Sequence, residues 1–206
     1  MSVRTPSLKL GGIVVFLMGL GLVALDAAAV SRQQADAFAR KIGVIEKQGS
    51  RPRRPAAPPQ RTPVSEAEIN SWFAYRSADV LPDGLTQPSL TIVGNGAVTG
   101  NATVDLDAVA RSRTSGRGFD LWNLVGGRVP VTMGGIIRTR NGRARFELQD
   151  AAISGIPVPR RIVQELVAYY SRTPQHPNGH QLDEEFEMPA GIQTIEMTPG
   201  AAVVVQ

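Results

Sequence analysis

Residues 129–153 read VPVTMGGIIRTRNGRARFELQDAAI, and this stretch decides the fold. Two runs of alternating polar and apolar residues, 129–140 and 143–153, flank Asn141-Gly142. Asn-Gly between two alternating runs is typical of a two-residue type I′ turn. The sequence therefore predicts an antiparallel hairpin, with residue pairs fixed by that turn. One predicted face is apolar and belongs to the core; it pairs Thr139 with Ala144, Ile137 with Phe146, and Gly135 with Leu148.

The opposite face of this hairpin carries four arginines in two facing pairs, Arg138 with Arg145 and Arg140 with Arg143. Ile136–Glu147 and Gly134–Gln149 continue the predicted pairs on this face. Like charges directly opposite each other destabilise a sheet slightly, which a solvated tip tolerates. The alternative is an anion-binding site for a lipid phosphate or another polyanion, because guanidinium groups bind such oxygens in a fork.

Working outward, similar patterns predict the rest of an α+β body. Ser65-Glu66-Ala67-Glu68 is a capping box that opens a helix over 66–75, and a second apolar stripe predicts a helix over 159–172. Strands are predicted over 89–93, 97–106, 192–197 and 201–205, with a loop over 111–120 and a helical turn over 121–125. The predicted fold is a curved antiparallel β-sheet with two packing helices, preceded by an N-terminal transmembrane or signal helix. The final valines are expected in an inner strand or in a covered edge strand.

Charge is distributed unevenly along the 206 residues, which carry 22 Lys and Arg, 18 Asp and Glu and a net charge of +4. Residues 1–63 hold ten basic and three acidic residues, whereas residues 64–206 hold twelve and fifteen. The basic character therefore belongs to the N-terminal third, which argues against nucleic-acid binding by the body. The absence of Cys excludes disulfides, Cys-ligated zinc and thiol catalysis.

The N-terminus has the pattern of a membrane signal. Arg4 and Lys9 precede an uncharged apolar run over 10–25, and Ala27–Val30 extends it past Asp26. Residues 1–30 are predicted to be a signal anchor in the inner (cytoplasmic) membrane, with the N-terminus inside and the C-terminal domain extracytoplasmic. The alternative is a signal peptide cleaved after Ala27-x-Ala29, which would leave a secreted or periplasmic protein.

Two connecting segments follow this predicted anchor. Residues 31–48 carry an apolar stripe at helical spacing and basic residues around it, which predicts a juxtamembrane helix. This helix is expected to pack on the body or on a partner, or alternatively to lie on anionic lipid. Residues 49–63 form a Pro/Arg-rich spacer, and residues 64–206 are the predicted domain.

The sequence contains none of four common catalytic or nucleotide-binding motifs, GxSxG, the P-loop, GxGxxG and HExxH. His176 and His180 are separated by Pro and Gly and lack the spacing of a helical metal site. We therefore expect no enzyme activity, cofactor or metal. Apolar residues on the two predicted helices form either plain core or a groove for an acyl chain; they are Ile162, Leu166, Tyr170, Trp72 and Phe73.

Several segments together resemble a known group of proteins. These are Val64–Phe73, Gly155-Ile156-Pro157-Val158-Pro159 with its helix, and Met188-Pro189-Ala190-Gly191-Ile192 before a last hairpin. In this order they resemble the YpmS-like bacterial envelope proteins and, more remotely, the tubular lipid-binding (TULIP-like) proteins, over residues 64–206. The resemblance implies a membrane-anchored, non-enzymatic domain with a curved sheet and a lipid groove, and it transfers no site residues.

The expected function is therefore that of a membrane-anchored envelope protein that binds or transfers lipid. The alternative is a structural or assembly subunit that binds another envelope protein through the helix over 31–48 and an edge strand.

Overall fold

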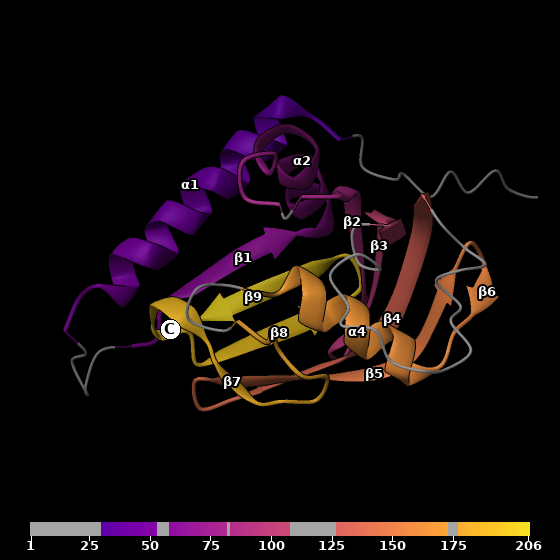
Figure 1. Ribbon diagram of the computed structural model, residues 1–206. Coiled ribbons are helices and arrows are strands. Elements are labelled where there is room, and N and C mark those ends of the chain that lie inside the picture. Colours follow the sequence, from indigo (N-terminus) through magenta and orange to yellow (C-terminus); the bar gives the residue numbers. More distant parts are fainter. Residues whose placement is uncertain (1–29, 53–57, 82, 108–126, 173–176) are drawn as a thin grey trace, which may run out of the picture.

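The computed structural model describes residues 30–52, 58–81, 83–107, 127–172 and 177–206 (Figure 1). The described part is α+β, as predicted, but its strands form two antiparallel sheets and three α-helices pack on them. The predicted anchor up to residue 29, the loop over 111–120 and the turn over 121–125 lie outside the described residues. Within the described ranges, no helix is both long and apolar enough to cross a membrane.

The larger sheet has the strand order β2-β3-β4-β5-β6, with a short β7 paired to the end of β5. Its strands are β2 (Leu85–Gly94), β3 (Ala97–Asp105), β4 (Arg128–Arg140), β5 (Arg143–Ile153), β6 (Ile156–Pro157) and β7 (Phe186–Glu187). The predicted hairpin is the β4–β5 pair, and it forms the middle of this sheet because β3 pairs along the other side of β4.

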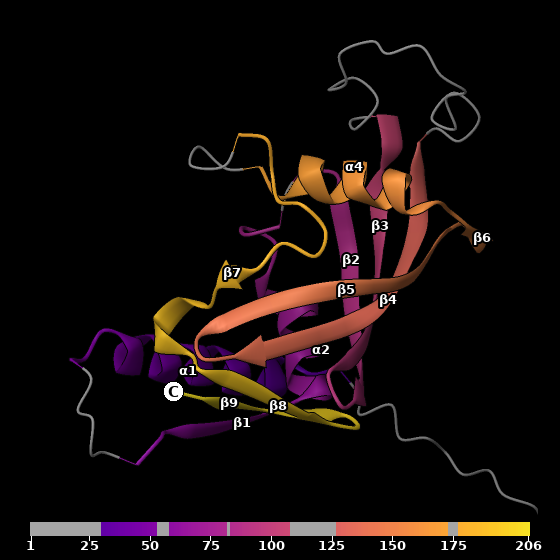
Figure 2. The same ribbon diagram turned by 90° about the horizontal axis from the view of Figure 1, so that it is seen from below.

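The register of the hairpin is confirmed from the turn as far as Gly135 and Leu148, and it is wrong beyond that point. Gly134 faces Asp150 instead of Gln149, because a β-bulge places one extra residue in β5. The bulge lies where the Phe146 ring packs over Gly135, a position at which a Cβ would meet that ring and would lie 2.6 Å from the Glu147 carbonyl oxygen. Figure 2 shows β4 and β5 curving along their length.

The smaller sheet has the order β1-β9-β8 and joins segments from nearly opposite ends of the described chain. Its strands are β1 (Arg61–Ser65), β8 (Thr194–Thr198) and β9 (Ala201–Val205), so the C-terminal valines lie in an inner strand, the first of the two predicted placements. β1 begins within the predicted spacer over 49–63. Pro63 is tolerated there because β1 is an edge strand.

The two sheets are connected by backbone hydrogen bonds at the ends of β2 and β8. Gly200 donates its N–H to the Ile92 carbonyl at 2.8 Å, and Asn95 donates to the Met197 carbonyl at 3.1 Å. The hairpin tip also reaches this sheet, since Gly142 donates to the Gln193 carbonyl at 3.0 Å. The β-sheets therefore form one continuous body.

Three helices complete this body, α1 (Arg32–Gly49), α2 (Glu66–Arg76) and α4 (Arg160–Tyr170), together with a 3₁₀ turn, η2 (Pro189–Gly191). α2 and α4 confirm the predicted helices to within one or two residues. α4 lies across the larger sheet (Figures 1 and 2). α1 packs against α2, where the Phe38 and Trp72 rings meet edge to face with their centroids 6.1 Å apart.

The close approach at the bulge gives a prediction about Gly135. We expect Gly135→Ala to lower the free energy of unfolding by roughly 1–3 kcal/mol, because the added methyl group overpacks against Phe146 and the β5 backbone. Gly100→Ala in β3 is the control, since a Cβ there would meet only atoms at 3.9 Å. Urea unfolding of the full chain in mild detergent, followed by tryptophan fluorescence, measures both; equal effects would contradict the packing argument.

Candidate functional site

The structure brings the four predicted anion-site arginines together beside the turn of the β4–β5 hairpin. Arg138 faces Arg145 and Arg140 faces Arg143, as predicted. All four line a hollow of about 660 Å³, whose other walls include Asn95, Ile195 and Met197.

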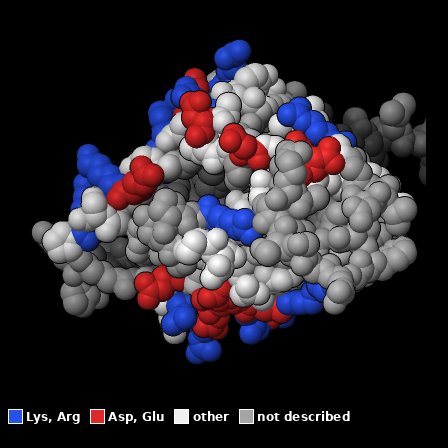
Figure 3. All heavy atoms as spheres, viewed as in Figure 1, with Lys and Arg blue, Asp and Glu red and all other residues white. Residues whose placement is uncertain are grey.

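Carboxylates already pair with three of these four arginines. Arg138 Nε donates to one Glu147 oxygen at 2.8 Å and Arg145 donates to the other, while Arg143 lies 3.2 Å from Glu185. The hydrogen bonds from Arg138 and Arg145 hold the pKa of Glu147 below its ordinary value. Acidic and basic side chains are interspersed along this edge of the molecule, near β5 and β7 (Figure 3). Two carboxylates therefore balance about half of the arginine charge, and anion binding here stays a prediction.

The five residues predicted to line a groove do not lie together: some are buried in the core and others are at the surface. Ile162 and Leu166 are 3% and 6% exposed, and they pack into a closed cluster between α4 and the larger sheet. Trp72 packs against Phe38 and Phe73. Of the five predicted groove residues, only Phe73 lies on the open groove beside α2.

That groove has a volume of about 740 Å³ and lies between α2, the loop after it and the start of β2. Its apolar lining includes Val30, Phe73, Ala74, Leu81, Leu85 and Pro88. Asp83 is the only charged side chain among the described residues of this lining. Size and composition both fall within the range of small-molecule sites. The sequence offered little signal for it, since the lining combines α2, the loop after it and the bulged start of β2 with Val30 from the segment before α1.

The groove exists because α2 covers only part of the edge of β2. The Asn70 carboxamide pairs with Leu90 as a neighbouring strand would: its Nδ2 donates to the Leu90 carbonyl and its Oδ1 accepts from the Leu90 N–H, both at 2.8 Å. Glu66 accepts from the Ile92 N–H at 2.7 Å. Toward Leu85 the strand bulges, with Gln87 at a φ of 51°, and the helix no longer follows it. An open space remains between them.

Tyr170 contacts the loop that forms one wall of the groove. Its hydroxyl accepts from the Asp105 N–H at 3.2 Å and lies 3.5 Å from the carbonyl oxygen of Gly84, a lining residue. Burial raises the pKa of the Tyr170 hydroxyl. Gly84 has a φ of 83°, and a Cβ there would lie 3.3 Å from this hydroxyl, so glycine suits the position on both counts. Tyr170 therefore acts on the groove through the Gly84 loop.

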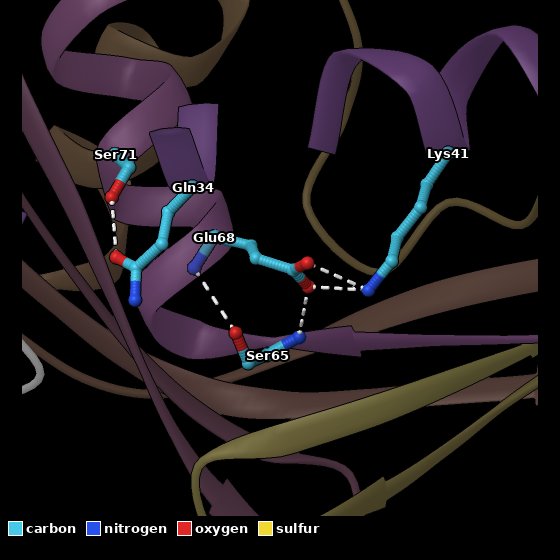
Figure 4. A network of polar contacts seen from close by, with 5 residues as sticks. All are labelled: Gln34, Lys41, Ser65, Glu68 and Ser71. Carbon is cyan, nitrogen blue, oxygen red and sulfur yellow. Dashed lines mark hydrogen bonds and ion pairs between the residues drawn. The ribbon is translucent and has the colours of Figure 1, made fainter. Parts of the chain in front are cut away.

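The N-terminal wall of the groove is held by polar contacts between α1 and α2 (Figure 4). Ser31 caps α1 and donates its N–H to Ser71 Oγ at 3.1 Å, and the Ser71 hydroxyl donates to Gln34 at 3.0 Å. Ser71 is fully buried. Because Val30 precedes Ser31 directly, these bonds fix Val30 at the groove.

Further along this interface, Lys41 donates to both Glu68 oxygens at 2.7 Å, and the Ser65–Glu68 capping box is present as predicted. Burial raises the pKa of Glu68, but the bonds from Lys41 and Ser65 together outweigh it, and the net shift is downward.

The predicted absence of a metal site concerns a different region. His176 lies outside the described residues, and the backbone N–H of His180 donates to Ser171 Oγ at 2.7 Å. Within the described ranges, no group of three or more His, Cys, Asp or Glu side chains is placed to hold a metal ion.

The covering of the β2 edge gives a prediction about Asn70. We expect Asn70→Leu to lower the free energy of unfolding by about 1–3 kcal/mol, because the Leu90 peptide groups lose their partners. The uncovered edge should also promote self-association, read by analytical ultracentrifugation. Asn101→Ala is the control, since the exposed Asn101 side chain accepts one bond from Thr132. An Asn70 variant that behaves like the control would refute this role.

The lowered pKa of Glu68 gives a prediction about pH. The ionised form is stabilised by folding, so its contribution is present above the ordinary glutamate pKa, about 4.3, and is lost as pH falls through the lowered value. We expect Glu68→Gln to cost roughly 1 kcal/mol at pH 7 and progressively less below pH 4. Urea unfolding at several pH values measures this difference. Glu196→Gln, which breaks an exposed pair with Arg61, should change stability less.

Comparisons of the chain with protein-family models, with curated proteins and with solved structures find no match.

Proposed function

We propose that this chain is a non-enzymatic lipid-binding protein held at the extracytoplasmic face of the inner membrane, and that the α2–β2 groove takes the apolar part of a lipid. Binding, or transfer between membranes, would depend on access from the bilayer to this groove. The resemblance to YpmS-like and TULIP-like proteins is part of the motivation.

The position of Val30 is the observation that carries the proposal. Val30 is a wall residue of the groove and the last residue of the predicted membrane segment. Only five peptide units separate it from Leu25, the end of the apolar run, and they span at most about 17 Å when fully extended. A segment 1–30 anchored in the bilayer would thus keep the groove close to the membrane interface.

The surroundings of the groove support an apolar ligand. Val30, Tyr75 and Val80 lie on or beside it, and they are 47%, 43% and 64% exposed. The polar side chains of Asn70 and Ser77 are turned to the protein: Asn70 pairs with Leu90, and Ser77 donates to the Phe73 carbonyl at 2.6 Å. Exposed apolar surface beside a concave site favours binding of apolar groups.

Native mass spectrometry of the full chain, extracted in detergent, tests the proposal. We expect bound lipid on the wild-type protein and a loss of roughly tenfold or more in lipid occupancy for Ala74→Trp, since the indole would fill the groove from an exposed position. Val93→Trp, an equally bulky change at an exposed site on the far end of β2, is the control. A lipid-free wild type, or equal retention by both variants, would refute lipid binding in this groove.

The second hypothesis, an assembly subunit, is distinguished by the same spectra. For an assembly subunit, we expect additional protein chains in the extracted complex, and we expect the spectra of the Ala74→Trp variant to match those of the wild type. The structure supports this second hypothesis less well. The Leu90 and Ile92 N–H groups already donate to side chains of α2, so that part of the β2 edge is not open to a partner strand.

A further inference from the structure

The face of α1 that points away from the body carries a basic stripe. The buried face of the helix contains Ala35, Phe38, Ile42 and Ile45, which matches the predicted stripe. Arg40, Val44 and Lys47 recur at intervals of four and three residues on the opposite face, Arg51 follows two residues after the end of the helix, and all four are exposed. Val44 is 50% exposed. α1 therefore packs on the body through its apolar side and exposes Val44, flanked by Arg40 and Lys47, on the other side.

The cations of this stripe form no ion pair with the carboxylates of α1 and α2, although Glu46 is exposed next to Lys47 in the sequence. Asp36 is paired with Arg76, and Glu68 with Lys41. Arg51 donates to the neutral Gln48 at 3.3 Å. Among the described residues, no ion pair is formed by Arg40 or Lys47. Figure 3 shows Lys and Arg side chains, with Asp and Glu side chains between them, along the outer rim of the molecule where α1 lies.

The chain that precedes α1 indicates what would meet this stripe. Residues 1–29 lie outside the described part, end directly beside the start of α1 and contain the predicted membrane segment. The 18 residues of α1 extend for about 27 Å, so the stripe would follow the bilayer surface if the helix lay parallel to it. The sequence continues the positive charge with Arg53 and Arg54.

We propose that α1 lies flat on the membrane, with Arg40, Lys47 and Arg51 against anionic phospholipid headgroups and Val44 at the interface. Cations near an anionic leaflet and a small apolar contact are the elements of interfacial helix binding. The opposite face stays packed on α2, so the whole domain would be oriented by this contact. The inference rests on the membrane location in the proposed function, and it does not depend on what the groove binds.

The absence of Cys allows a site-specific test. The full chain carrying Val44→Cys, labelled with a nitroxide, is reconstituted into vesicles of phosphatidylcholine with or without phosphatidylglycerol. We expect the label to be shielded from a water-soluble relaxation agent only in the anionic vesicles. A label at Val93→Cys, at the far end of β2, should stay accessible in both.

Charge reversal identifies the residues responsible. In the Val44→Cys background, Arg40→Glu with Lys47→Glu should abolish the shielding, whereas Arg161→Glu with Arg172→Glu, an equal charge change on exposed residues of another region, should preserve it. Equal loss in both variants would overturn the assignment to α1.

Vesicle flotation separates the two proposals. A chain that does not float with anionic vesicles overturns both the membrane location and the α1 contact. A chain that floats while the label at position 44 stays accessible overturns the α1 contact alone. Shielding that is equal in neutral vesicles would point to a protein contact and would also overturn it. Lipid retention in the groove, measured separately, is unaffected by any of these outcomes.

Discussion

The hydrogen bonds from α2 to the edge of β2 are the constraint on which the rest of the structure depends. A carboxamide offers one acceptor and two donors, so Asn70 completes the Leu90 peptide as another strand would. α2 follows β1 without an intervening residue, and its first residue, Glu66, bonds to Ile92. A short helix therefore fixes the two sheets relative to each other, and it positions α1 through the opposite side. The groove is the place where this covering ends.

The two basic surfaces of this protein, the hairpin arginines and the outer face of α1, differ in how many of their cations are paired with carboxylates. The arginines of the hairpin carry their own counter-charges, since Glu147 lies on the same strand face as Arg145 and reaches across to Arg138. The outer face of α1 lacks such partners among the described residues. Two clusters of similar composition thus differ in the free energy available for an anionic ligand, because a paired guanidinium must first give up its carboxylate.

Local signals in the sequence predicted the local structure well. Asn141-Gly142, the Ser65–Glu68 capping box and the stripe of α4 each depend on neighbours in the chain, and each is confirmed. The bulge opposite Gly134, where β5 carries the extra residue Gln149, lies beside the contact of the Phe146 ring with Gly135, and spacing alone encodes neither. The second sheet was missed because β1 looks like part of a proline-rich spacer and pairs only with β9. The groove was missed for a related reason: its walls come from α2, the loop after it, the bulged start of β2 and Val30, and no local pattern predicts how these segments meet.

The pairing of β1 with β9 has a consequence for how the chain reaches its folded state. Arg61 pairs with Val205, so the central strand of the smaller sheet is made only after nearly all of the body that separates it from its partner β1. Contacts so distant in sequence form slowly, because closing the long loop between them costs chain entropy before the contacts can stabilise the fold. If the chain crosses a membrane as an unfolded polymer, β1 must wait without a partner until β9 has arrived. That delay would keep the smaller sheet unformed until β9 has crossed.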